Sequence, residues 1–217
     1  MSKRRKGTVL AVLGAALLLL SGCRIVEPEK RAYPLVLGID EKDGTYQVYF
    51  GMAALPQMTG QGKSGEEDSQ GGNGKGYLMY TGKTLEEILA EYEKSQELYL
   101  DMGHIQAVIF GQNLYEQPGQ LAWILDSMEK TSTLGNAAYV YRSGSLEEVM
   151  AMNGGSIQSL GEYLAGIYEN RIGSSQPLIL RKVYSTLHNR QRIEEFPLVS
   201  PEGDSLTVMM ESSGDPV

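Results

Sequence analysis

The chain has 217 residues, of which 41% are hydrophobic, so it can bury one sizeable core and is not a wholly disordered chain. Its single cysteine excludes a small fold held together by disulfides within the chain. Because 19 Lys and Arg face 27 Asp and Glu, the formal net charge is −8 at pH 7, and we expect no nucleic acid among its partners.

The amino terminus has the pattern of a secretory signal. Residues 3–6 are all basic, and residues 9–20 follow without a charge. A helix of that length covers roughly 18 Å at 1.5 Å per residue, which is too short for a hydrocarbon layer of about 30 Å. The stretch is therefore typical of the apolar core of a signal peptide, not of a membrane-spanning helix.

The signal ends in Leu20, Ser21, Gly22 and Cys23, and this is the only cysteine of the chain. The run is similar to the bacterial lipobox, in which the thiol receives a diacylglycerol and the chain is cut just before the cysteine. Two acyl chains supply the two hydrophobic signals that stable anchoring needs. We expect a signal peptide over 1–22, lipidation of Cys23, a polar tether over 23–31 and an extracytoplasmic protein held on a lipid bilayer. A free thiol behind an ordinary signal is the alternative.

Two strands and a tight turn are predicted at the start of the mature domain. Residues 35–40 are mostly apolar, and residues 45–52 alternate in the manner of a half-buried strand. Between them, Asp43-Gly44 tolerates the positive φ that a two-residue hairpin requires, which predicts an antiparallel pair. Residues 60–76 contain seven glycines and no apolar side chain, and they predict a flexible insertion, after which residues 77–81 return to the sheet as a strand.

Helices and further strands follow. Two sequences of the capping-box type, Thr84 to Glu87 and Ser145 to Glu148, predict helix starts. A strand over 104–111, almost continuously apolar, is expected at the centre of the sheet, and another is expected over 137–142, parallel to it because a helix connects them. Apolar residues at helical spacing predict helices over 85–92, 121–128, 157–167 and 180–187.

These elements predict an α+β domain over residues 32–195, a mixed β-sheet with amphipathic helices packed on it. From Phe196 onward the pattern becomes strand-like again, and we expect a new sheet to begin there. Residues 196–217 are therefore assigned to the start of a truncated second domain or to a tail.

The chain offers few groups for catalysis. His104 and His188 are the only histidines, and the sequence has no metal-ligand spacing. We expect His104 to be a cap or a surface residue, and His188 to lie near the last carbonyls of a helix. No serine completes a Gly-x-Ser-x-Gly elbow. We predict no catalytic residue, no metal and no cofactor, and we assign to the core the tyrosines beside helical stripes: Tyr92, Tyr99, Tyr163, Tyr168 and Tyr184.

The order of these features resembles the amino-terminal domain of the Ger(x)C spore germination lipoproteins. The resemblance is carried by the lipobox cysteine, residues 36–40 with the hairpin at 43–44, residues 84–87 and the strand over 103–111. Members of this family are the C subunit of nutrient germinant receptors. The resemblance implies a non-catalytic protein, anchored by its lipid on the outer face of the spore inner membrane, that contacts the membrane subunits A and B. Only Cys23 is carried over as a site residue.

Two other functions remain as alternatives. An extracytoplasmic solute-binding lipoprotein would share the anchor, although such receptors usually need two lobes around a cleft, which is less natural for one sheet. An envelope hydrolase would need a nucleophile and a base, and the sequence supplies no plausible pair.

Overall fold

The computed structural model describes residues 27–52, 76–131, 133–171, 177–190 and 195–209, and it divides the chain into two units, 1–31 and 32–217. In the first unit, Pro28–Lys30 forms a short 3-10 helix, η1, with an ion pair of 3.0 Å between Lys30 Nζ and Glu27 Oε2. Among the described residues, no helix is both long and apolar enough to cross a membrane. The predicted insertion, apart from Gly76, lies outside the described residues.

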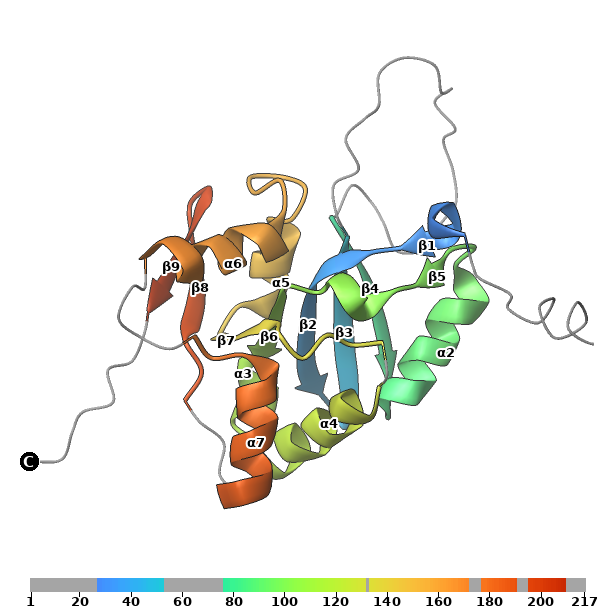
Figure 1. The fold of residues 1–217 in the computed structure, drawn as a ribbon, viewed down its shortest axis with the longest axis horizontal. Helices are drawn as coiled ribbons and strands as arrows, with labels where there is room; N and C mark the ends of the chain where they lie inside the picture. The colour runs from blue at the N-terminus through green and yellow to red at the C-terminus, as the bar shows by residue number, and fades with distance from the viewer. Residues whose placement is uncertain (1–26, 53–75, 132, 172–176, 191–194, 210–217) are drawn as a thin grey trace, which may run out of the picture. The chain divides into compact units, whose positions relative to one another are not determined.

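The second unit is built on a seven-stranded mixed sheet (Figure 1). In chain order its strands are β2 (Pro34–Lys42), β3 (Thr45–Met52), β4 (Tyr77–Gly82), β6 (Ala107–Gly111), β7 (Tyr139–Ser143), β8 (Leu198–Glu202) and β9 (Ser205–Met209). Their order across the sheet is β4-β3-β2-β6-β7-β8-β9. The four middle strands are parallel, whereas β3 and β4 at one edge and β9 at the other are antiparallel to their neighbours. A separate two-stranded pair joins β1 (Arg31–Ala32) and β5 (Tyr99–Leu100).

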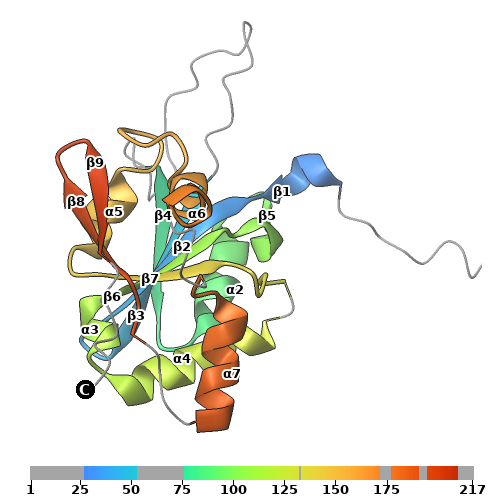
Figure 2. The same cartoon turned by 60° about the vertical axis from the view of Figure 1, so that its left-hand side comes forward.

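Helices cover both faces of the sheet. One face packs against α2 (Leu85–Ser95), α4 (Pro118–Lys130) and α7 (Leu180–Arg190), and the other against α5 (Leu146–Ala151) and α6 (Leu160–Arg171). Figure 2 shows these two helix layers on either side of the sheet. Two short elements, η2 (Met102–His104) and α3 (Gln112–Tyr115), flank β6. The predicted class, an α+β fold with a mixed sheet and packed helices, is confirmed.

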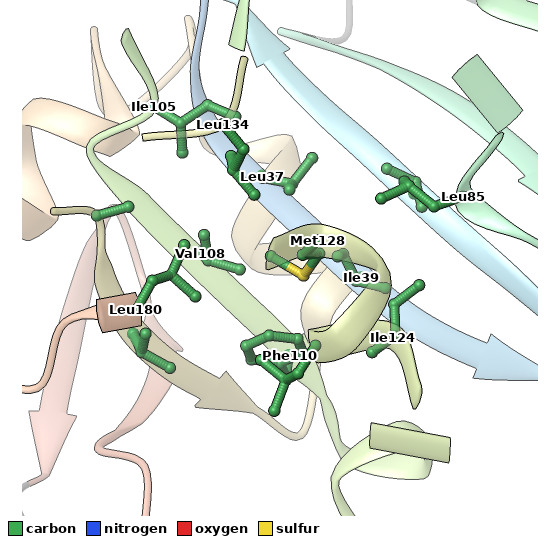
Figure 3. Close-up of a cluster of buried hydrophobic side chains, with 14 of the residues drawn as sticks. Leu37, Ile39, Leu85, Ile105, Val108, Phe110, Ile124, Met128, Leu134 and Leu180 are labelled. Carbon is green, nitrogen blue, oxygen red and sulfur yellow. The ribbon is translucent and has the colours of Figure 1, made fainter. Parts of the chain in front are cut away.

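The alternation of side chains along each strand explains the two layers. Leu37 and Ile39 of β2, and Val108 and Phe110 of β6, belong to the core under α2, α4 and α7 (Figure 3). The residues between them on the same strands face the core under α5 and α6. All five residues of β6 are buried, which agrees with its apolar sequence and with the prediction of a central strand. The strand begins at Ala107 and not at His104, because Met102–His104 form the turn η2.

The hairpin between β2 and β3 is confirmed. Asp43 and Gly44 have φ angles of 53° and 80°, the left-handed values of a type I′ turn, and Lys42 pairs with Thr45 across it. The Thr45 hydroxyl adds a hydrogen bond of 2.9 Å to the carbonyl of Lys42.

Both predicted helix starts are confirmed, since α2 begins after Thr84 and α5 after Ser145. One of the two capping boxes forms in part, and the other does not form. At α2, Thr84 Oγ1 accepts from the Glu87 N–H at 3.1 Å, while the Glu87 carboxylate accepts from the Lys83 N–H instead of the Thr84 N–H. At α5, Ser145 makes no side-chain cap. Its backbone N–H donates instead to Ser143 Oγ at 3.2 Å, so the serine two residues earlier holds this turn.

The expectation that a new sheet begins at Phe196 is also wrong, because β8 and β9 continue the same sheet. The Arg142 N–H donates to the Pro197 carbonyl at 2.9 Å, and Arg142 Nε donates to the Phe196 carbonyl at 3.1 Å. The Phe196 ring is buried, with its centroid 5.4 Å from those of Phe110 and Tyr115. These contacts attach β8 to β7.

Candidate functional site

A large groove lies at the carboxyl ends of the parallel strands. The strands β2 and β6 are neighbours, and the chain leaves them in opposite directions across the sheet. After β2 it turns to β3 on one side, and after β6 it continues to β7 on the other side. Ligands of open sheets usually bind outside the carboxyl ends of the strands at such a point. The groove has a volume of about 1080 Å³ and is bordered by the end of β2, by Asn113 and Gln117 after β6, and by residues 144–148 after β7.

Carboxylates dominate the lining of this groove, which we call the acidic groove. Among the described residues, Lys42 is the only basic one that lines it, and its acidic lining residues are Asp40, Glu41, Asp43, Glu116, Glu147 and Glu148. The excess of negative charge favours partners that are cationic or that donate hydrogen bonds.

Asp40 holds the start of α3. It follows the apolar part of β2 and is one of the residues that carry the sequence resemblance. Its Oδ1 accepts from the backbone N–H groups of Leu114 and Glu41, both at 2.9 Å, and its Oδ2 accepts from Asn113 Nδ2 at 3.2 Å. Burial raises the pKa of Asp40 above its ordinary value, although these hydrogen bonds oppose the shift. A Cβ at Gly111, the N-cap of α3, would overlap the Asp40 carboxyl group. The carboxylate thus replaces a cap that glycine cannot supply.

Glu41 has a comparable role in the hairpin. Its Oε1 accepts from the Gly44 N–H at 2.6 Å, and its Oε2 accepts from Gln117 Nε2 at 2.5 Å. The side chain therefore joins the hairpin to the residue that precedes α4. Two further groove carboxylates accept hydrogen bonds within the domain, Glu116 from Gln112 Nε2 at 2.6 Å and Glu147 from the Tyr77 hydroxyl at 3.3 Å. Within the described part of the chain, no group of three or more His, Cys, Asp or Glu is arranged to hold a metal ion.

The sequence singled out four lipobox residues and two histidines. Leu20, Ser21, Gly22 and Cys23 lie outside the described residues. His104 is on the surface as expected, with its ring edge-on to Tyr33 at 4.9 Å between centroids. His188 Nε2 lies 2.6 Å from Glu129 Oε2, so it contacts a carboxylate of α4.

The tyrosines largely follow the prediction of core packing. Tyr92, Tyr168 and Tyr184 are buried, and Tyr163 packs partly against the core. The prediction is wrong for Tyr99, which is 57% exposed on the two-residue strand β5.

The sequence analysis did not predict the acidic groove. The run Asp40-Glu41-Lys42-Asp43 directly after an apolar strand was the available signal, since charged residues at a strand end often border a site. The remaining carboxylates come from segments more than seventy positions further along the chain, and only the strand order brings them to the same edge.

The fold and the groove together define an α+β domain with an acidic groove at the carboxyl edge of its sheet. The family model described as the spore germination protein N-terminal domain matches residues 24–197. The chain belongs to this family, and the resemblance seen in the sequence is confirmed. No curated protein and no solved structure matches the chain. Family membership supports a role in spore germination.

Proposed function

We propose that the chain is the lipid-anchored C subunit of a nutrient germinant receptor, which acts in germination through contacts with the membrane subunits A and B and without catalysis. The observation that carries the proposal is the match to the spore germination family over residues 24–197, directly behind the lipobox-like Leu20, Ser21, Gly22 and Cys23. A diacylglycerol on Cys23 would hold the protein on the outer face of the spore inner membrane.

The length of the tether limits where the domain lies. From Cys23 to Arg31 there are nine residues, and an extended chain spans at most about 3.6 Å per residue. Ala32, the first residue of the second unit, would therefore lie within about 30 Å of the bilayer surface. Subunits embedded in the same membrane are within reach of a domain held at that distance.

The acidic groove supports a role in protein contact. Its carboxylates offer hydrogen-bond acceptors to a basic surface of a partner, and Asp40 and Glu41 are already engaged in hydrogen bonds that hold α3 and the hairpin. Charged patches of this kind steer association and select partners of opposite charge.

Mass spectrometry of the amino-terminal peptide, prepared from native spore membranes, tests the anchor. We expect the chain to begin at a diacylglycerol-modified Cys23, and we expect a Cys23→Ala variant to leave the membrane fraction. Glu29→Ala, which changes the tether but not the lipobox, should remain membrane-bound. An unmodified thiol with the leader still attached would contradict the proposal.

A solute-binding lipoprotein is the second candidate, because the acidic groove, at about 1080 Å³, has the volume of a small-molecule site. Under that function, a selective ligand would stabilise the protein against thermal unfolding in proportion to its occupancy. A thermal-shift screen of amino acids and small cations distinguishes the two functions. The solute-binding function requires at least one of them to raise the Tm, whereas the receptor-component proposal requires none to do so.

A further inference from the structure

The only tryptophan of the chain forms part of a stacked pair at the surface. Trp123 lies on the outer side of α4 with 42% of its surface exposed. Its ring is nearly parallel to that of Tyr46 on β3, at an interplanar angle of 9° and a centroid distance of 5.5 Å. Tyr46 is only 4% exposed, so the stack has one buried partner and one partner that faces solvent.

Hydrogen bonding fixes this pair in place. The Tyr46 hydroxyl donates to Gln120 Oε1 at 2.7 Å, and Gln120 lies one turn before Trp123 on the same helix. Burial raises the pKa of Tyr46, so the phenol stays protonated and remains a donor across the physiological range. The ring on which the indole stacks is therefore held in place before any ligand arrives, which lowers the cost of binding.

A second pocket opens beside this stack, and we call it the aromatic pocket. It has a volume of about 240 Å³ and is lined by Glu41, Gly44, Tyr46, Lys83, Gln120 and Trp123. These residues come from the β2–β3 hairpin, the turn before α2, and α4. The pocket shares Glu41 with the acidic groove but has a different composition, because its one carboxylate is matched by one ammonium group.

The lining determines which ligands fit. With no net charge, the aromatic pocket has no electrostatic preference for phosphates or polycations, unlike the acidic groove. An open indole surface takes an apolar ring face, and the amide, carboxylate and ammonium groups around it offer both donors and acceptors. The volume is below the 300–1,000 Å³ that is usual for drug-sized ligands, which limits the occupant to about one ring.

We propose that the aromatic pocket binds a neutral pyranose ring, either as a free sugar or at the end of a glycan. The C–H face of the ring packs on Trp123, and its hydroxyls exchange hydrogen bonds with Gln120, Lys83 and Glu41. This site goes beyond the proposed receptor function, since it requires neither the lipid anchor nor the A and B subunits.

Trp123 itself reports on the pocket, because it is the only tryptophan of the chain. The full-length protein in detergent is titrated with glucose, N-acetylglucosamine and a tetramer of N-acetylglucosamine while the indole fluorescence is recorded. We expect a saturable change with at least one of these probes. Equal response to the monomer and the tetramer indicates recognition of a single ring, whereas a response to the tetramer alone assigns the site to glycan ends. Either result supports the proposal.

Variants separate binding at this pocket from other effects. Gln120→Ala removes an exposed amide and keeps the reporter, and it should weaken the affinity about five-fold or more. Tyr99→Ala removes an exposed aromatic ring outside the pocket and should leave the affinity unchanged. Trp123→Ala should abolish the saturation-transfer NMR signal of the sugar while circular dichroism shows a folded protein. The proposal is overturned by the absence of a saturable response up to 100 mM of every probe, or by a response that Gln120→Ala leaves intact.

Discussion

The buried side chain of Asn153 forms hydrogen bonds to parts of the chain that are far apart in the sequence. Its Nδ2 donates to the carbonyls of Met52 and Gly76, at 2.9 and 2.5 Å, and its Oδ1 accepts from the Leu160 N–H at 2.9 Å. Met52 and Gly76 flank residues 53–75, so one amide joins the end of β3 and the start of β4 to the beginning of α6.

Replacing this side chain leaves two partly buried carbonyls and the buried Leu160 N–H without this partner. We expect Asn153→Ala to lower the free energy of unfolding by about 2–3 kcal/mol, as measured by urea denaturation. Asn189→Ala is the matched control, because Asn189 is exposed on α7 and donates only to Ser185 Oγ among the described bonds of its side chain, so its change should stay within about 0.5 kcal/mol. Equal effects of the two substitutions would show that the Asn153 bonds do not support the fold.

The stability of the protein should depend on pH through Asp40. Burial raises its pKa in the folded state above the ordinary value of 3.8, so the folded protein binds this proton more tightly than the unfolded chain does. Its contribution to stability is therefore greatest at and below pH 3.8 and declines as the pH rises through the raised pKa. Asp40→Asn keeps an acceptor for the Leu114 and Glu41 N–H groups but does not titrate.

Urea denaturation of both proteins between pH 3 and pH 7 measures this effect. We expect the stability of the wild-type protein, relative to that of Asp40→Asn, to fall as the pH rises over this range. A relative stability that rises with pH would mean that the hydrogen bonds to the carboxylate outweigh its desolvation, and that the pKa is lowered.

At the scale of the elements, the least expected feature is the membership of β8 and β9 in the sheet. Phe196 is buried against Phe110 and Tyr115 just before β8 begins, whereas Met209 at the end of β9 is 49% exposed. Phe196→Ala should lower the free energy of unfolding by about 3–5 kcal/mol, and Met209→Ala by no more than about 0.5 kcal/mol. If chemical denaturation gives a small loss for both, β8 and β9 are not an integral part of this domain.

The elements predicted correctly are those whose signals are local. The β2–β3 hairpin follows from Asp43-Gly44, and α2 follows from Thr84 and the apolar stripe behind it. The prediction failed where a distant residue decides the structure. The side chain that caps α3 in place of its N-cap Gly111 is that of Asp40, 74 positions before Leu114. Likewise, β8 is attached by Arg142, more than fifty positions before Phe196. No pattern within a short window contains those pairings.

The two pockets could not be predicted from the sequence for the same reason, since their residues come from distant parts of the chain. Asp40 and Glu41 could be noted as charged residues after a strand, but the groove that they share with Glu116 and Glu147 exists only once β2, β6 and β7 are neighbours. Likewise, Trp123 belongs to an amphipathic helix in the sequence, and its stacking on Tyr46 depends on how α4 lies against the start of β3. The lipobox, in contrast, is a purely local signal, and its modification stays a prediction.

At the scale of the whole molecule, the chain is an acidic α+β domain of the spore germination family. Under the proposed function, lipid holds it near a membrane, and its acidic groove contacts basic surfaces of its partners. Such contacts are charge-assisted and weaken when salt screens them. Removing negative charge from the groove without disturbing the residues that hold the fold should therefore weaken association. Glu116→Gln and Glu148→Gln meet that condition better than changes at Asp40 or Glu41 do.

Affinity purification of the tagged full-length protein from detergent-solubilised spore inner membranes tests the central claim most directly. We expect the A and B subunits of a germinant receptor to be recovered with it at low salt, and we expect the double variant Glu116→Gln, Glu148→Gln to recover less of both. Recovery of an intact, membrane-bound chain without either subunit would contradict the claim.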